Sequence, residues 1–165
     1  YARDMFLFSF YTRGMSFIDM AYLKKSDLKN GIITYRRRKT GQQLTVKWEK
    51  CMEDIIAKYG ENTATRYLLP IITNPCSDER PQYRNAICRI NVALKEVAGL
   101  AGLNIPLTMH VARHCWASVA KSKNIPLSVI REGMGHDSEE TTRIYLASLD
   151  TSVVDKANSL ILKDF

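Results

Sequence analysis

The sequence of 165 residues lacks any paired-cysteine motif. Its four cysteines, Cys51, Cys76, Cys88 and Cys115, are scattered, which argues against a zinc site and a disulfide framework and suits a reducing cytoplasm. It also lacks a run of about 18 apolar residues, so we expect no membrane-spanning segment. There is no internal repeat and no low-complexity tract. These absences leave a globular protein of one domain's length.

An initiator methionine and a signal-peptide cleavage site are also missing. The chain starts as YARDMFLFSFYTRGMSF, in what reads as the middle of a helix, so we expect a fragment of a longer protein. Acidic residues are in the minority. There are 17 Asp and Glu against 24 Lys and Arg, which gives a formal net charge of +7. A basic excess on a small domain favours a polyanionic partner, with nucleic acid as the first expectation.

Hydrophobic spacing predicts a mostly helical chain with one antiparallel β-hairpin. Strands are expected around Ile33 and Tyr35 and around Leu44 and Val46, with the hairpin tip at Thr40-Gly41. The tip carries the basic run YRRRK. The predicted helices cover residues 3–12, 15–25, 48–59, 82–101, 108–123, 127–133, 138–147 and 150–163.

The stretch HVARHCW, residues 110–116, contains the densest chemistry in the chain. On a helix, His110 and His114 share a face, as two zinc ligands would. The zinc-hydrolase pattern needs Glu after the first histidine, and Val111 stands there instead. No third ligand is evident nearby, so metal binding is disfavoured. His114 is expected to pack and cap locally beside Trp116.

Phosphate binding accounts for the same stretch better. His110 and Arg113 are neighbours on one helix face, and His110 lies in the first turn after Thr108, where backbone N–H groups and the helix dipole favour an anion. Arg113 can donate two parallel hydrogen bonds to phosphoryl oxygens. From these two residues alone, an ordinary surface role is equally acceptable.

A second box, MGHDSEETTRIY at 134–145, favours the phosphate hypothesis. If these segments converge, every role in phosphodiester cleavage has a candidate. Tyr145 would attack phosphorus, Arg113, His110 and His136 would stabilise the equatorial oxygens, and Lys39 at the hairpin tip would protonate the leaving 5′-oxygen. His136 or His110 could take the tyrosine's proton.

In this order and spacing, HVARH, MGHDSEETTRIY and the hairpin KTG resemble the boxes of the tyrosine recombinases, the phage integrases and related site-specific recombinases. The resemblance covers essentially the whole chain as the C-terminal catalytic domain. It implies the mainly helical catalytic fold of that family, with a small antiparallel sheet. The segment FYTRGMSFIDMAYLKKSDL looks most like integrases of mobile elements in Bacteroides-type bacteria.

Carried over box by box, the resemblance implies catalytic roles for Lys39, His110, Arg113, His136 and Tyr145. One box departs from the pattern, because Ser16 stands where the family usually has a second phosphate-clamping arginine. Losing that arginine weakens transition-state stabilisation unless another cation substitutes. We interpret this as an altered active site, and a weakened enzyme remains the alternative. The candidate substitutes are Arg13, Arg36, Arg37 and Arg38.

The resemblance also implies the partners and the chemistry. Tyr145 would form a 3′-phosphotyrosyl bond to double-stranded DNA and free a 5′-hydroxyl, with no metal or other cofactor. Four protomers would assemble on two DNA sites, while the isolated domain, residues 1–165, would be monomeric and would lack an N-terminal DNA-clamping domain. The last helix would pack on its own core or dock on a neighbouring protomer. We expect a cytoplasmic, nucleoid-associated bacterial enzyme of DNA integration, with Arg36, Arg37 and Arg38 contacting DNA.

Two alternatives remain at this stage. Residues 117–135 have helix–turn–helix character, so the chain could be a non-catalytic DNA-binding regulator. That hypothesis gives Lys39, His110, His136 and Tyr145 no task. A type IB topoisomerase-like enzyme would share the chemistry, although the short chain and the integrase-style boxes count against it.

Overall fold

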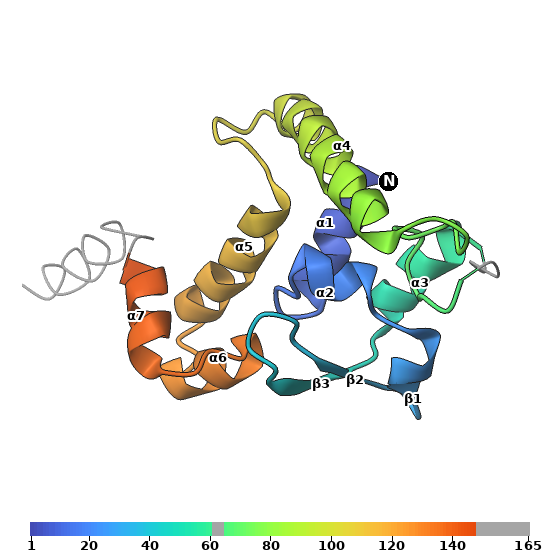
Figure 1. Cartoon of the computed structure of the whole chain (residues 1–165). Coiled ribbons are helices and arrows are strands. Elements are labelled where there is room, and N and C mark those ends of the chain that lie inside the picture. Colours follow the sequence, from blue (N-terminus) through green and yellow to red (C-terminus); the bar gives the residue numbers. More distant parts are fainter. Residues whose placement is uncertain (61–64, 148–165) are drawn as a thin grey trace, which may run out of the picture. The chain divides into compact units, whose positions relative to one another are not determined.

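The computed structural model describes residues 1–60 and 65–147, and within the last helix it leaves the side chains of residues 145 and 147 undescribed. The described part of the chain forms two compact units, one ending at residue 116 and the other beginning at residue 117 (Figure 1). Within the described residues, no helix is both long and apolar enough to cross a membrane. The helix expected at 150–163 lies outside the described residues.

The first unit confirms the predicted combination of helices and hairpin, with shifted boundaries. Its helices and strands are α1 (Ala2–Tyr11), α2 (Phe17–Ala21), the 3-10 turn η1 (Lys25–Asp27), β1 (Leu28–Lys29), β2 (Ile32–Arg36), β3 (Gln43–Lys47), α3 (Lys50–Lys58), α4 (Glu79–Leu100) and the larger part of α5 (Met109–Ser122). The core is built from α1, α2, the inner face of the sheet, α3 and α4. Its largest fully buried side chains include Phe8, Met5, Met15, Met20, Ile33, Met52 and Leu94.

The sheet has three antiparallel strands in the order β1-β2-β3, one more than the sequence predicted. Ile33 pairs with Val46 and Tyr35 pairs with Leu44, so the alternating apolar residues share the buried face. Asn30 and Gly31 both have positive φ, 51° and 72°, the conformation of a tight hairpin turn between β1 and β2.

Two helix boundaries differ from the sequence prediction for tertiary and capping reasons. The helix expected at 15–25 ends at Ala21, because Leu23 accepts a hydrogen bond from the backbone N–H of Leu68 and the next residue bridges to Tyr67. The helix expected from residue 82 begins at Glu79, where the carboxylate of Asp78 accepts the N–H of residue 80. Proline at 81 is tolerated because a first-turn N–H has no intrahelical acceptor.

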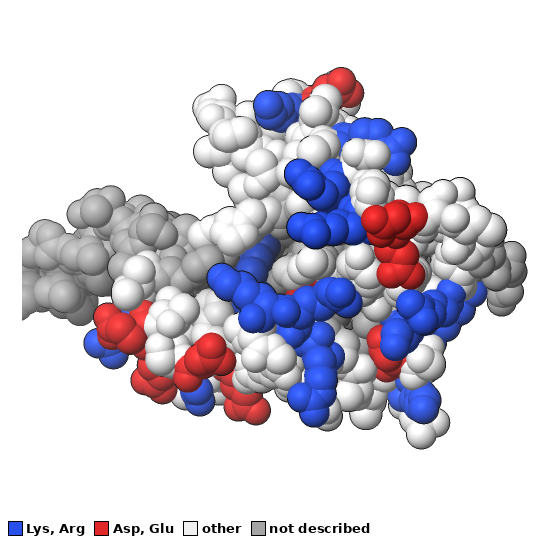
Figure 2. All heavy atoms as spheres, viewed as in Figure 1, with Lys and Arg blue, Asp and Glu red and all other residues white. Residues whose placement is uncertain are grey.

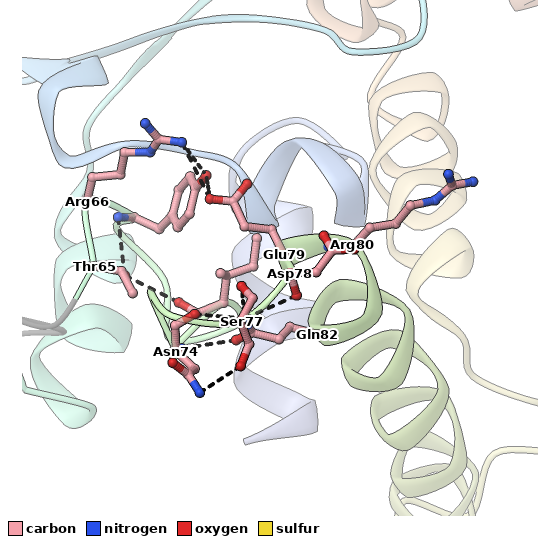
Figure 3. Close-up of polar contacts among 10 residues, drawn as sticks. Thr65, Arg66, Asn74, Ser77, Asp78, Glu79, Arg80 and Gln82 are labelled. Carbon is pink, nitrogen blue, oxygen red and sulfur yellow. Dashed lines mark hydrogen bonds and ion pairs between the residues drawn. The ribbon is translucent and has the colours of Figure 1, made fainter.

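A polar network shapes the chain from residue 65 to the start of α4 (Figure 3). The side chain of Gln82 accepts from the backbone N–H groups of Thr73 and Asn74 and donates to the carbonyls of Asn74 and Ser77. Further along, Glu79 accepts a 2.6 Å hydrogen bond from the hydroxyl of Tyr67. These contacts attach the loop to the first turn of α4.

The second unit contains the end of α5, α6 (Leu127–Met134) and α7 (Glu139–Ala147). α5 ends at Ser122, and Asn124, with φ of 56°, turns the chain just after it. Ser138 caps α7 by accepting the N–H of Thr141. Ile130, Met134 and Leu146 are buried. α6 and α7 pack against each other.

Asp4 ties α1 to the end of α3. It is 4% exposed and accepts hydrogen bonds from Arg3, from Nζ of Lys58 and, at 2.8 Å, from the hydroxyl of Tyr59. Burial raises the pKa of Asp4, but the hydrogen bonds from Tyr59, Arg3 and Lys58 outweigh it and hold the pKa below its usual value.

We predict that Asp4→Asn lowers the free energy of unfolding at pH 7 by about 1–3 kcal/mol. Because the folded-state pKa of Asp4 is depressed, its contribution is present above the unfolded-state pKa and disappears as the pH falls through the folded-state value. The gap between wild type and variant should therefore close in acid. Denaturant unfolding from pH 7 to pH 2.5 measures this gap.

The matched control is Asp54→Asn, since Asp54 forms only an exposed pair with Lys50 and its loss should cost under about 0.5 kcal/mol. A gap that stayed constant with pH would contradict the prediction.

Candidate active site

Arg113 is a buried cation in the middle of the first unit's candidate site. It lies on α5 and is 7% exposed, and its Nη1 donates a 2.7 Å hydrogen bond to the carbonyl of Gly14. A buried guanidinium needs hydrogen-bond acceptors or a counter-charge, because leaving water is costly. The contact fixes the guanidinium against the turn that follows α1.

The turn can hold Arg113 only because residue 14 has no side chain. Gly14 has φ of +74°, and a Cβ there would lie 2.7 Å from Cγ and 2.8 Å from Cα of Arg113. The preceding Arg13 also has positive φ, 62°. The N–H of Gly14 closes the turn onto the carbonyl of Ser9 at 2.8 Å. The backbone of α5 therefore packs directly on the end of α1.

The charges of three arginines, Arg113 and two others, influence the pKa of one buried phenol, that of Tyr35. Tyr35 is 8% exposed, and burial together with the negative charge of Asp19 raises its pKa. The positive charges of Arg113, Arg37 and Arg13 oppose that rise, in this order of strength. Three guanidinium groups and one carboxylate are thus gathered around one tyrosine. A cluster with a surplus of positive charge attracts an anion.

The two histidines of HVARH touch each other. The ring centroids of His110 and His114 lie 4.6 Å apart, edge to face, with His110 exposed and His114 half-buried. Burial, then the charges of His110 and Arg113, lower the pKa of His114. The surroundings of His114 therefore favour its neutral form, whereas His110 faces solvent one turn before Arg113. Among the residues that the structure describes, no group of three His, Cys, Asp or Glu side chains could hold a metal ion.

The hairpin tip separates its basic residues into distinct environments. Arg37 is 8% exposed, and its backbone N–H donates to the carbonyl of Gln42 at 2.9 Å. Arg36 is exposed and donates to the carbonyl of Gly41, while Arg38 lies with its guanidinium carbon 3.8 Å from the ring centroid of Tyr22. Lys39 follows with an exposed side chain. The expectation that all three arginines face DNA therefore fits the exposed pair, Arg36 and Arg38, better than the buried Arg37.

Ser16 has a structural task in this chain. Its hydroxyl caps α2, accepting the N–H of Asp19 and donating to the carboxylate of Asp19 at 2.6 Å. The other carboxylate oxygen accepts the backbone N–H of Arg38 at 2.8 Å. Asp19 is 5% exposed, so one buried carboxylate links the serine's position to the hairpin tip.

In the second unit, His136 is positioned by a turn and a threonine. α6 ends at Gly135 with φ of +63°, and the N–H of His136 donates to the carbonyl of Arg131. Its Nδ1 lies 2.9 Å from Oγ1 of Thr142, which is fully buried and also contacts the carbonyl of Ser138. Tyr145 is three residues further along α7. His136 and Tyr145 thus lie in one short segment, the turn after α6 and the helix α7, and local contacts set its geometry.

The comparisons with known proteins agree on one family. The sequence pattern that defines the phage integrase family matches residues 2–152. The chain belongs to the phage integrase family. Tyrosine recombinase XerC of Thermodesulfovibrio yellowstonii is 28% identical over 144 residues, which cover 82% of this chain and 46% of that protein. The chain therefore spans about half the length of this curated relative.

Solved structures of the same fold cover almost the whole chain. The XerA recombinase superposes with a TM-score of 0.65 at 20% identity, over 96% of this chain and 62% of that one. The XerH site-specific recombinase bound to its palindromic difH substrate, a post-cleavage complex, also gives a TM-score of 0.65 at 20% identity, over 96% of this chain and 45% of that one. These matches confirm the predicted fold class, a mostly helical recombinase catalytic domain with a small antiparallel sheet.

Within this family framework, the structure adds residues that sequence reasoning missed. Asp19, Tyr35, Thr142 and the glycine at 14 all contact or act on the candidate residues. The sequence carried a weak signal for Thr142, since it lies inside the second box. It carried none for Tyr35, which reads as an ordinary inward-facing strand residue.

Positive charge also extends beyond the candidate residues. Figure 2 shows Lys and Arg side chains gathered over the hairpin and the neighbouring part of α4. Exposed basic residues of these two elements include Arg36, Arg38, Lys39, Arg80 and Arg84. Such a surface suits a phosphate backbone, whose binding is dominated by contacts of this kind.

We predict that Gly14→Ala lowers the free energy of unfolding by at least about 3 kcal/mol, because the new methyl adds a clash with Arg113 to the backbone strain at positive φ. Gly31→Ala is the matched control. Gly31 has φ of +72° but open space around its Cβ position, so only the strain of about 1–2 kcal/mol should appear. Denaturant unfolding measures both. Equal losses in the two variants would show that the contact between residue 14 and Arg113 contributes nothing.

Proposed function

We propose that this chain is the catalytic part of a site-specific DNA recombinase that cleaves and rejoins double-stranded DNA through a 3′-phosphotyrosyl intermediate. The observation that carries the proposal is the buried Arg113, fixed by the Gly14 carbonyl and sharing its surroundings with the cations Arg37 and Arg13. Such a preorganised positive cluster fits the charge that develops on a pentacoordinate phosphate. Membership of the phage integrase family supports the same conclusion.

Each candidate residue has a defined role in the proposed mechanism. The phenolic oxygen of Tyr145 attacks phosphorus and forms the O–P bond, while His136 or His110 takes its proton. The bond from phosphorus to the 5′-oxygen breaks, and Nζ of Lys39 gives that oxygen its proton. Arg113 stabilises the equatorial oxygens throughout. The freed 5′-hydroxyl of a partner strand then reverses the step, so no external energy source is needed.

We propose Arg37 as the cation that replaces the arginine expected at position 16. Ser16 caps a helix and carries no charge. Arg37 is buried like Arg113, whereas Arg13 is only half-buried, and the charges of both act on the phenol of Tyr35. The neighbouring Arg36 and Arg38 are exposed and engaged with Gly41 and Tyr22, which suits DNA-backbone contacts instead. Arg13 remains the second choice.

The wider assignments follow from this function. We propose double-stranded DNA as the substrate, a tetramer on two paired sites as the active assembly and a monomer for residues 1–165 alone. A DNA-clamping domain would precede this catalytic domain, and a mobile element of Bacteroides-type bacteria would encode the protein. The enzyme would act on nucleoid DNA in the bacterial cytoplasm. The XerH complex with difH supports DNA as the ligand class.

We predict that the full-length protein is trapped covalently on nicked DNA through Tyr145. The probe is a pool of duplexes with a nick beside a randomised stretch, from which cleavage releases a short 5′-hydroxyl fragment that diffuses away. A denaturing gel should show a protein–DNA band for wild type and for Tyr11→Phe, a control tyrosine on α1, and none for Tyr145→Phe.

The gel outcome decides between the enzyme and the regulator. Tight DNA binding by wild type without any covalent band would contradict the proposal and favour the helix–turn–helix regulator. A covalent band without strand exchange between two captured sites would favour the topoisomerase-like alternative.

We predict that Arg37→Gln lowers the single-turnover cleavage rate about a hundredfold or more at saturating DNA, the loss typical of one oxyanion-stabilising donor. The control is Arg36→Gln, the exposed neighbour. It should weaken DNA binding and reduce its salt dependence while leaving the saturated rate nearly unchanged. Thermal unfolding of both variants checks that the fold is intact. If instead Arg13→Gln abolished cleavage while Arg37→Gln did not, Arg13 would be the clamp.

A further inference from the structure

Arg38, which contacts Tyr22, is the residue directly before Lys39, the proposed general acid. The guanidinium carbon of Arg38 stands 3.8 Å from the centroid of the Tyr22 ring, well within the range of a cation–π interaction. The backbone N–H of the same arginine donates to the buried carboxylate of Asp19 at 2.8 Å. Arg38 is thus held at its backbone and at the end of its side chain, and Lys39 is the next residue.

The ring of Tyr22 also packs against two other aromatic rings. It meets the edge of Tyr67 at 5.7 Å between centroids and the ring of Tyr83 on α4 at 6.5 Å. The hydroxyl of Tyr67 donates to Glu79 at 2.6 Å, and Arg66 contacts both Tyr67 and Glu79 (Figure 3). This aromatic support (Tyr22, Tyr67 and Tyr83) connects the short helix α2 to the long helix α4.

The space beside this contact is open. A cavity of about 320 Å³ is lined by residues that include Asp19, Tyr22, Tyr35, Arg36 and Arg38. Because Arg38 lines this cavity together with Tyr22, the cavity offers room for the arginine side chain if the ring of Tyr22 is removed. Its loss would leave the Arg38 side chain free to move into the cavity and loosen the hairpin tip.

We propose that Tyr22 is a positioning residue for the DNA-cleavage reaction: its ring holds Arg38 and thereby fixes the hairpin tip that presents Lys39 to the leaving 5′-oxygen. The inference rests on the proposed function, and specifically on Lys39 as general acid. Tyr22 touches neither the DNA nor the reacting atoms in this role. Its effect is confined to the step in which the 5′-oxygen receives a proton.

The chemistry of the leaving group provides a specific readout. When a 5′-bridging sulfur replaces the 5′-oxygen, the P–S bond breaks to release a thiolate, which needs no proton because a thiol is a far stronger acid than an alcohol. A variant that acts only by misplacing Lys39 therefore cleaves the sulfur substrate normally. A variant with a generally damaged site cleaves both substrates slowly.

The experiment measures single-turnover cleavage by the full-length protein on a duplex selected by the covalent capture described above, with oxygen or with sulfur at the 5′-bridging position. Tyr22→Leu should slow cleavage of the oxygen substrate about five- to tenfold, the scale of one lost cation–π contact, and leave the sulfur substrate at the wild-type rate. Tyr22→Phe keeps the ring and is the matched control, with both rates unchanged.

A second variant, at an exposed residue, tests the same contact even if Tyr22→Leu does not fold. Arg38→Gln breaks the same contact from an exposed side chain. At saturating DNA, where weaker DNA binding no longer affects the rate, it should show the same oxygen-specific loss and add nothing further when combined with Tyr22→Leu. Equal losses on both substrates, or no loss on either, would overturn the role of Tyr22.

The variant Lys39→Ala distinguishes a failure of this inference from a failure of the proposed function on which it rests. Recovery of Lys39→Ala on the sulfur substrate, without recovery of Tyr22→Leu, would overturn the inference alone. Failure of Lys39→Ala to recover would overturn the role of Lys39 as general acid.

Discussion

The first unit depends on one buried polar contact, the hydrogen bond from Arg113 to the carbonyl of Gly14. It requires a glycine, because α5 passes so close to the turn after α1 that a methyl group would overlap the arginine's own backbone. The same contact gives an acceptor to a guanidinium that has left water, and it orients the charge. Fold stability and the placement of the proposed phosphate clamp thus share a single interaction.

The positively charged groups near Tyr35 repel one another, and one carboxylate, that of Asp19, partly offsets this repulsion. The charge of the buried Asp19 acts on Tyr35 in opposition to those of Arg113, Arg37 and Arg13, and its carboxylate also binds Ser16 and the hairpin backbone. Like charges held together by the surrounding structure repel one another. A bound phosphate would relieve that repulsion, which is a physical reason for the proposed preference for an anion.

The hairpin cations differ in burial, and this difference matches the two roles proposed for them. A group that stabilises developing charge gains from burial, because a low dielectric strengthens its interaction, and the burial of Arg37 suits its proposed role. A group that gives a proton to a leaving oxygen must reach the DNA, and Lys39 is exposed at the tip. Fixing its neighbour Arg38 between a carboxylate and an aromatic ring limits the freedom of the tip without burying the lysine.

The sequence by itself determined the features that depend on near neighbours. The hairpin pairing, the Gly135-His136 turn before α7 and the shared helix face of His110 and Arg113 all arise from residues a few positions apart. They were predictable because turn chemistry and side-chain periodicity are local. The family boxes were recognisable for the same reason.

Tertiary structure alone decided which candidates are buried, and therefore what each can do. YRRRK reads as three equivalent arginines, yet long-range packing buries only the middle one. Ser16 caps α2 through a local contact with Asp19, but the hydrogen bond from Arg38 to that carboxylate joins residues 19 positions apart and needed the tertiary fold. The helix expected at 15–25 ended early because a distant segment, residues 67–68, hydrogen-bonds to the chain after α2. Burial and long-range hydrogen bonds depend on which segments meet in space, and no local pattern encodes that.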